Sequence, residues 1–262
     1  MTIDFEQLTR EQLKHRAKDG YAAVIPLGAI EQHGPHLPTG TDTFVCREMS
    51  RRSVQTAADK GIKLVLCPVL PIGCSAHHLA FGGTLSFASN TYLSILKDIG
   101  GSLIDSGFRR IIFLNAHGGN EHLMHQAATD LAVQHPIWTA SASYWSIARE
   151  ALEAAGAAET GPFPGHAGGF ETSLVMAQDR HRIDRSQIGK HHQERDWIKG
   201  LMPGTFVGRH MELTGVDGFT DSAGAATAAH GRRYMEAIVQ AVSSWLADVC
   251  SRMDEADSGK SM

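Results

Sequence analysis

The segment from residue 31 to residue 43 carries carboxylates and imidazoles in a stretch rich in glycine and proline. Glu31 and His33 are two residues apart, so in an extended segment both side chains leave the backbone on the same face. Asp42 follows a loop whose prolines and glycines would bend the chain back. Carboxylates with imidazoles, and no thiolate, are the ligand chemistry of Zn, Mn or Fe. For this segment alone, the alternative is a solvated polar loop at the end of a strand.

A second segment places a histidine directly after a predicted strand. The charged lead-in and short apolar run at 109–115 predict a strand that is buried on both faces. His117 then lies at the carboxyl end of the sheet, where open α/β folds bind their ligands. The pair Gly118 and Gly119 lets the backbone approach a bound group closely, so we expect both to line the substrate pocket.

A third segment, 165–173, again sets a histidine and a glutamate, His166 and Glu171, around glycines. One such cluster carries little information. Three of them, each at a predicted loop, favour a metal site over surface decoration.

Taken together, these segments resemble the creatininase family of metal-dependent amidohydrolases over nearly the whole chain. The matching pieces are 27–38 with 40–43, 115–120, and 165–168 with 171–173, with weaker matches at 82–86 and 215–231. The resemblance implies a compact α/β/α sandwich, a two-metal site, hydrolysis of a C–N bond in a cyclic or small amide, and assembly of the chain as a homo-hexamer.

The resemblance also implies which residues bind the two ions. In the family, the glutamate and the histidine of the first motif bind different metals, which gives Glu31 to one ion and His33 to the other. The aspartate of that motif, here Asp42, bridges both ions. The histidine of the Asn-x-His motif, here His117, completes the first site.

This chain departs from creatininase proper at two positions. Creatininase proper has a glutamate ligand two residues after the histidine of the Asn-x-His motif, where this chain has Gly119. We expect Glu171 to replace that ligand, since the second ion otherwise keeps only a histidine and the shared aspartate. Creatininase proper also carries a tryptophan shortly before the histidine of the third motif, where this chain has 163–165. Both departures argue against creatinine as the substrate.

Further roles follow for the residues around the ligands. We expect His166 to carry the proton to the leaving nitrogen, because an imidazole titrates near working pH; the alternative is a structural hydrogen bond. His78 is expected to line the pocket, with a solvated loop position as the alternative. His36, Asn115 and Asn120 are expected to support the metal ligands.

Composition fits a single enzyme domain spanning residues 1–262. Hydrophobic residues make up 42% and charged residues 20% of the chain, and the formal net charge of -4 argues against nucleic acid or anionic membranes as partners. The four cysteines form no CxxC pair, which indicates reduced thiols. Without a targeting signal or a membrane-length apolar stretch, we expect a cytoplasmic protein.

Alternating patterns predict a mostly parallel central sheet covered by helices on both faces, that is, a three-layer α/β/α sandwich. Segment 190–218 is irregular and is interpreted as an ordered surface excursion, with a subunit contact or a lid as alternatives. The tail from 254 to 262 is expected to fray. Predicted strands lie near Val24, Val65, Ile112 and Trp138, and predicted helices span 44–58, 91–105, 121–134 and 223–250.

The sequence therefore predicts a metal-dependent hydrolase of a small amide, lactam or formamide, with two divalent ions: zinc is favoured, with manganese or iron open. The His-Gly-Gly-Asn form also resembles family members that remove a formyl group or trim modified peptides. The alternatives are hydrolysis of a C–C bond in a cyclic diketone and a non-catalytic metal-binding protein. Only the amide reaction liberates an amine.

Overall fold

The computed structural model describes residues 2–188, 207–208 and 218–259. In these ranges a four-stranded parallel sheet has the order β2-β1-β3-β4, and the central pair runs from Ala23 opposite Ile111 to Leu27 opposite Asn115. The predicted α/β fold is confirmed. The strands are β1 (Ala22–Leu27), β2 (Leu64–Leu66), β3 (Arg110–Asn115) and β4 (Trp138–Ser143).

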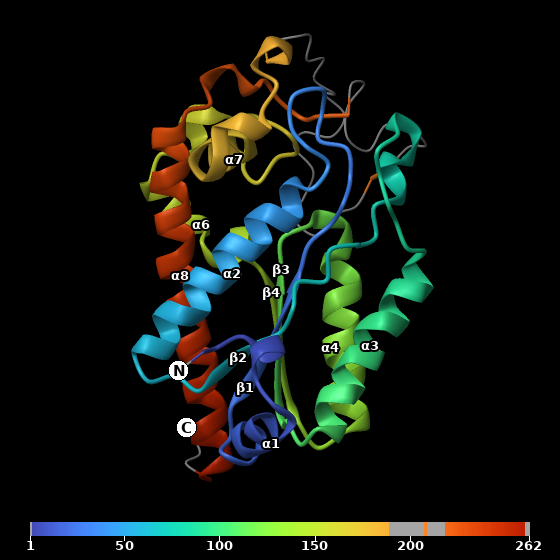
Figure 1. Cartoon of the computed structure of the whole chain (residues 1–262), viewed down its shortest axis with the longest axis vertical. Coiled ribbons are helices and arrows are strands. Elements are labelled where there is room, and N and C mark those ends of the chain that lie inside the picture. Colours follow the sequence, from blue (N-terminus) through green and yellow to red (C-terminus); the bar gives the residue numbers. More distant parts are fainter. Residues whose placement is uncertain (1, 189–206, 209–217, 260–262) are drawn as a thin grey trace.

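Helices cover both faces of the sheet (Figure 1). On one face, Val24 and Ile112 pack with residues of α2 (Thr41–Asp59), α7 (Gly169–Asp179) and α8 (Ala228–Asp257). On the other, Ile25 and Phe113 pack with residues of α3 (Ser89–Asp105) and α4 (Glu121–Gln134). Successive strand residues alternate between the two cores, as the strand period of two requires. The shorter helices are α1 (Arg10–Lys18), α5 (Tyr144–Ile147) and α6 (Arg149–Ala154).

The strand order places a topological switch between β1 and β3. From β1 the chain passes through α2 to β2 on one side, and then through α3 to β3 on the other side of β1. In open α/β sheets the crevice at such a switch, at the carboxyl ends of the strands, is where ligands bind. Glu31 follows β1 and His117 follows β3, so the topology brings both to this crevice.

Several predicted boundaries were wrong. Helix α2 begins at Thr41 rather than at residue 44, so Asp42 lies in its first turn and not in a loop. Helix α8 begins at Ala228, after a short 3-10 turn at Ala223–Ala225, and continues to Asp257. The expected fraying from 254 is absent up to that point, because Arg110 forms ion pairs with two aspartates of the last turns.

One further predicted helix matches the structure, and one predicted segment lies mostly outside the described residues. The predicted helix at 121–134 is confirmed. Of the irregular segment 190–218, only 207–208 and 218 are described. None of the helices in the described ranges has the length and apolar character needed to cross a bilayer.

Candidate metal centre

The first group of potential ligands joins the ends of two strands and the start of a helix. Glu31, Asp42 and His117 are buried, and their ligand atoms lie within 4.8 Å of one another. His117 Nδ1 is 3.2 Å from Glu31 Oε1 and 3.0 Å from Asp42 Oδ2. These distances leave room for one ion among one imidazole and two carboxylates.

The second group shares the same aspartate. His33 Nε2 lies 3.1 Å from Asp42 Oδ1 and 3.7 Å from Glu171 Oε2. The two carboxylate oxygens of Asp42 therefore face different histidines, one in each group. This is the arrangement of a carboxylate that bridges two ions.

The donor atoms fit divalent cations. Glu31 Oε2 is buried and accepts no hydrogen bond from any residue in the described ranges, and buried Asp42 Oδ2 faces the ring nitrogen Nδ1 of His117. Burial of a carboxylate oxygen is costly unless a partner satisfies it, and a metal ion is such a partner. Oxygen and imidazole donors without thiolates suit zinc and manganese.

The hydrogen bonds of the two histidines orient their rings toward the centre. His33 Nδ1 lies 3.0 Å from the main-chain oxygen of Glu31, and His117 Nε2 lies 3.2 Å from that of Cys74. In a neutral ring, an N–H that donates to a carbonyl leaves the other nitrogen unprotonated, and this is the form that binds a metal ion. In both residues that nitrogen is the one facing the carboxylates.

The electrostatics of the centre also call for positive charge. Burial lowers the pKa of His33, but the carboxylates of Asp42, Glu171 and Glu31 together outweigh burial and raise this pKa to about 10. Burial likewise opposes charge on His117, and the Glu31 and Asp42 carboxylates raise its pKa well above the usual value. Burial raises the pKa of Glu171 to about 8. Protons on the imidazoles thus balance the carboxylates where a cation would otherwise do so.

Glu171 is held in place by its own loop and helix. The backbone N–H of Ala167 donates to Glu171 Oε2 at 2.6 Å. Glu171 also lies in the first turn of α7, as Asp42 lies in that of α2, where the helix dipole favours negative charge. The expectation that Glu171 approaches the second group is consistent with this geometry.

His166 points its Nδ1 atom at the first group. Its Nε2 lies 2.9 Å from the main-chain oxygen of Gln32, and its Nδ1 lies 3.5 Å from Glu31 Oε1. Burial holds the pKa of His166 well below the ordinary value, so the ring is neutral. Thr220 fixes the backbone here by accepting the His166 N–H on Oγ1 at 2.7 Å. A neutral imidazole with an unprotonated nitrogen in the centre can accept a proton.

The three predicted supporting residues have different roles. Asn115 accepts the His117 backbone N–H at 3.1 Å and donates to the His117 carbonyl at 2.8 Å, so it fixes the loop of that ligand. Asn120 accepts the Cys74 N–H and donates to the Gly28 carbonyl, which ties three loops together. His36 Nε2 lies 2.9 Å from Thr172 Oγ1, the residue after Glu171 on α7.

The three residues predicted to line the pocket, His78, Gly118 and Gly119, lie in different surroundings. His78 is 1% exposed and its Nε2 lies 3.4 Å from Glu31 Oε1, so the alternative of a solvated loop position was wrong. A Cβ atom on Gly118 would meet nothing within 4 Å. A Cβ atom on Gly119 would lie 2.1 Å from the Cys74 carbonyl oxygen, so this backbone leaves no room for a glutamate there.

Residues beyond those predicted also contribute. Gln32 is buried between the first two ligands and contacts both His78 and His166. Ser75 Oγ lies 3.1 Å from His117 Nε2, and the His77 ring stacks on His117 at 6.0 Å between centroids. The position of Gln32 between Glu31 and His33 was a signal in the sequence; Ser75 and His77 became visible only through the fold.

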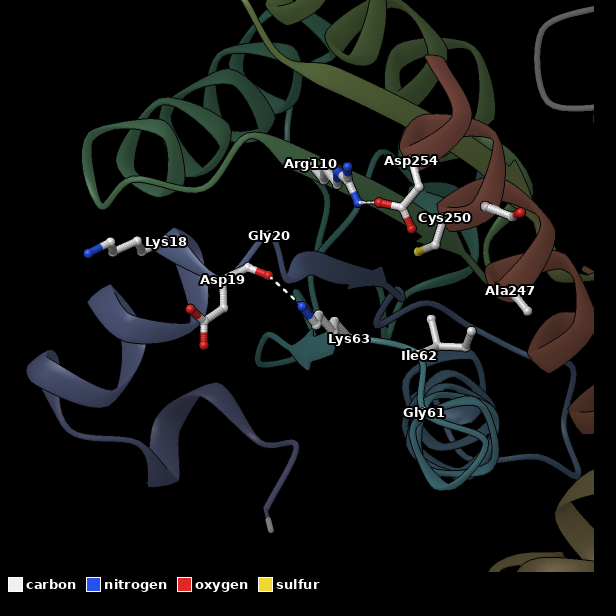
Figure 2. A pocket seen from close by; sticks show the side chains of 11 residues that line it. Lys18, Asp19, Gly20, Gly61, Ile62, Lys63, Arg110, Ala247, Cys250 and Asp254 are labelled. Atoms are coloured by element: carbon white, nitrogen blue, oxygen red, sulfur yellow. Dashed lines mark hydrogen bonds and ion pairs between the residues drawn. The ribbon is translucent and has the colours of Figure 1, made fainter. Parts of the chain in front are cut away.

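A separate hollow of about 490 Å³ lies at the opposite, amino-terminal edge of the sheet (Figure 2). Arg110 in this hollow is paired with Asp254, and Lys63 donates to the Asp19 carbonyl. Open parallel sheets bind their ligands at the opposite end of the strands, the carboxyl end. The candidate functional site is therefore the group of buried histidines and carboxylates at the carboxyl ends of the strands.

Comparison with known proteins gives a consistent family match. A family model for creatininase, described as creatinine amidohydrolase, matches residues 6–246. A creatinine amidohydrolase of Pseudomonas putida is 26% identical, over 71% of this chain and 75% of its own.

Two relatives with other activities match over shorter stretches. A mycofactocin precursor peptide peptidase of Mycobacterium tuberculosis is 35% identical over 37% of this chain and 40% of its own. A 3-dehydro-scyllo-inosose hydrolase of Thermotoga maritima is 32% identical over 44% of this chain and 36% of its own. The match thus spans about two fifths of the length of each of these two relatives.

Among solved structures, a creatinine amidohydrolase (creatininase) superposes with a TM-score of 0.76 at 24% identity, over 94% of this chain and 97% of that one. This likeness shows the fold. Similar creatininase structures include a manganese form and a zinc–zinc form.

Proposed function

Because the chain belongs to the creatininase family, we propose that it is a metal-dependent hydrolase that cleaves the C–N bond of a small cyclic amide, lactam or formamide. The observation that carries this proposal is the shared aspartate. Asp42 presents one oxygen to Glu31 and His117 and the other to His33 and Glu171. A carboxylate between two ligand groups is the requirement of a binuclear centre.

The proposed cofactor is a pair of divalent ions, with zinc favoured and manganese or iron as alternatives. Glu31, Asp42 and His117 would hold one ion, and His33, Asp42 and Glu171 the other. Such ions supply an activated water and polarise a carbonyl oxygen when bound.

The chain itself supplies the proton transfer. His166 Nδ1 is unprotonated and faces the centre, so it can accept the proton released as water adds to the amide carbonyl. The same nitrogen then donates that proton to the leaving nitrogen, so that amide and water yield an acid and an amine. His78 and Gly118 are proposed to line the space for the substrate.

We further propose that the chain forms a homo-hexamer, which sedimentation analysis would test.

A second candidate is hydrolysis of a C–C bond in a cyclic diketone. The match to a hydrolase of 3-dehydro-scyllo-inosose, a cyclic ketone, favours it, because the same centre can polarise a ketone. The products separate the two reactions, since only cleavage of a C–N bond releases an amine.

The test is a screen of the protein loaded with zinc or manganese against small amides, lactams, formamides and cyclic diketones. We expect release of an amine or ammonia, and no such release by the Asp42→Ala variant under the same conditions. Turnover of diketones alone would overturn the amidohydrolase proposal and support the second candidate.

A further inference from the structure

Three imidazoles of the centre share one feature. The ring nitrogen that faces away from the centre lies within 3.2 Å of a main-chain carbonyl oxygen in His33, in His117 and in His166. In the neutral form of such a ring, the nitrogen beside the carbonyl carries the proton and the nitrogen facing the centre is unprotonated. His78 is another imidazole beside Glu31, and the partner of its second ring nitrogen is different.

The partner behind His78 is an amide nitrogen. His78 Nδ1 lies 2.7 Å from Gln32 Nε2, and His78 Nε2 lies 3.4 Å from Glu31 Oε1. An amide NH2 group donates two hydrogen bonds and accepts none. If Gln32 Nε2 faces the ring, His78 Nδ1 must be the acceptor.

The remaining contacts of Gln32 fix the orientation of its amide. Gln32 Oε1 accepts the backbone N–H of Gly34 at 2.9 Å, and Nε2 donates to the Gly218 carbonyl at 2.6 Å. A flipped amide would place its NH2 group against the Gly34 N–H and its oxygen against the Gly218 oxygen. Gln32 Nε2 also lies 3.2 Å from His166 Nε2, but that ring nitrogen donates to the Gln32 main-chain oxygen. The two amide protons are therefore assigned to the closer partners, Gly218 and His78.

The main chain of the same residue orients His166. Gln32 O accepts the His166 Nε2–H at 2.9 Å, and the two rings, His78 and His166, stack with centroids 4.2 Å apart. Both rings carry their proton on Nε2. They are turned in opposite directions, so His78 presents an N–H to Glu31 and His166 presents a lone pair.

We propose that Gln32 is a positioning residue that assigns complementary roles to two neighbouring histidines, His78 as a hydrogen-bond donor and His166 as a proton acceptor. His78 is then unsuited to bind a metal ion through Nε2, although it lies in a group of possible ligands with Glu31 and His77. Its N–H can instead stabilise negative charge on a substrate oxygen. This chemical use rests on the proposed function, whereas the protonation of the two rings does not.

The test reads the ring nitrogens directly, in zinc-loaded protein labelled with ¹⁵N-histidine, by long-range ¹H–¹⁵N correlation. His78→Asn and His166→Asn variants identify the two rings. In the wild-type protein we expect the proton on Nε2 of both. In Gln32→Glu an oxygen replaces Nε2 behind His78, so its Nδ1 resonance should move into the protonated range, while His166 should stay unchanged because its partner is a main-chain carbonyl.

Two controls keep the result interpretable. Gln134→Glu makes the same chemical change on the exposed end of α4 and should move neither ring. If Gln32→Glu fails to fold, Gln32→Met removes the donor without adding charge and should leave His78 with a mixture of both neutral forms. A wild-type His78 with its proton on Nδ1, or a His78 that keeps Nε2–H in the folded Gln32 variants, would overturn the proposal. Neither result depends on whether a substrate is turned over, so failure of the proposed function would be seen separately.

Discussion

At the scale of single residues, Asp42 determines the geometry of the centre. Its two oxygens face His33 and His117, while Glu31 and Glu171 approach from either side. The sequence indicated the ligand types, because carboxylates and imidazoles clustered without thiolates. It named Glu171 as the replacement for the family glutamate at Gly119, but it could not show that Glu171 lies 3.7 Å from His33, since that depends on how α7 packs against the first motif.

Gln32 illustrates what residue types cannot show. Its place between Glu31 and His33 was visible, but its effect depends on contacts with a loop near residue 78 and another near residue 218. Such contacts join segments far apart in the chain, and they follow from the fold rather than from spacing. The orientation of a single amide then decides which histidine donates and which accepts.

The proposed role of His166 gives a first prediction. The His166→Ala variant should keep its metal content and lose turnover by roughly two to four orders of magnitude, as expected for a lost general acid–base group. Elemental mass spectrometry and an amine-release assay measure the two effects. His125→Ala, an exposed histidine on α4, is the matched control and should change neither. Loss of metal from His166→Ala would make His166 a ligand instead.

At the scale of elements, the starts of helices and the ends of strands bring the ligands together. The positions of the central strands and of α4 could be predicted, because periodicity and flanking glycines define them. The start of α2 at Thr41 could not be predicted. Gly40, Thr41 and Thr43 are weak helix formers, so tertiary contacts decide their conformation. This matters for the site, since it places Asp42 in the first turn of the helix.

The loop after β3 gives a second prediction. A Cβ atom at Gly119 would lie 2.1 Å from the Cys74 carbonyl oxygen, whereas one at Gly118 would meet nothing within 4 Å. We therefore expect Gly119→Ala to lower the free energy of unfolding by about 1–3 kcal/mol, as overpacking does, and Gly118→Ala to have little effect. Urea denaturation measures both. Equal stability of the two variants would show that the loop adapts freely and that Gly119 is not required by packing.

At the scale of the whole molecule, the strand order explains why these segments meet. The order in which strands are added to the parallel sheet reverses between β1 and β3, and both strands end at the same crevice. The three-layer architecture followed from the alternation of predicted strands and helices. The extension of α8 to Asp257 could not be predicted from this alternation, because it depends on ion pairs between the last turns of α8 and Arg110 at the start of β3.

The charge balance of the centre gives a third prediction. In metal-free protein the pKa of His33 is raised to about 10 and that of His117 also lies well above its usual value, so both rings are protonated near pH 7. A metal ion must displace these protons, so apparent zinc affinity should rise with pH between about 6 and 9 and fall as the pH is lowered, by up to about tenfold per displaced proton per pH unit. Calorimetric titration in buffers of different ionisation enthalpy counts the released protons. Affinity that does not change with pH would contradict this account of the charges.

The central claim is a binuclear centre bridged by Asp42 and completed by Glu171. The most direct measurement is metal content per chain, by elemental mass spectrometry, of the wild-type protein, Glu171→Gln and Asp42→Ala, each loaded with zinc and then dialysed. We predict about two equivalents for the wild type, about one for Glu171→Gln and close to none for Asp42→Ala, because the aspartate serves both ions. A single equivalent in the wild type, or two equivalents in Glu171→Gln, would contradict the account.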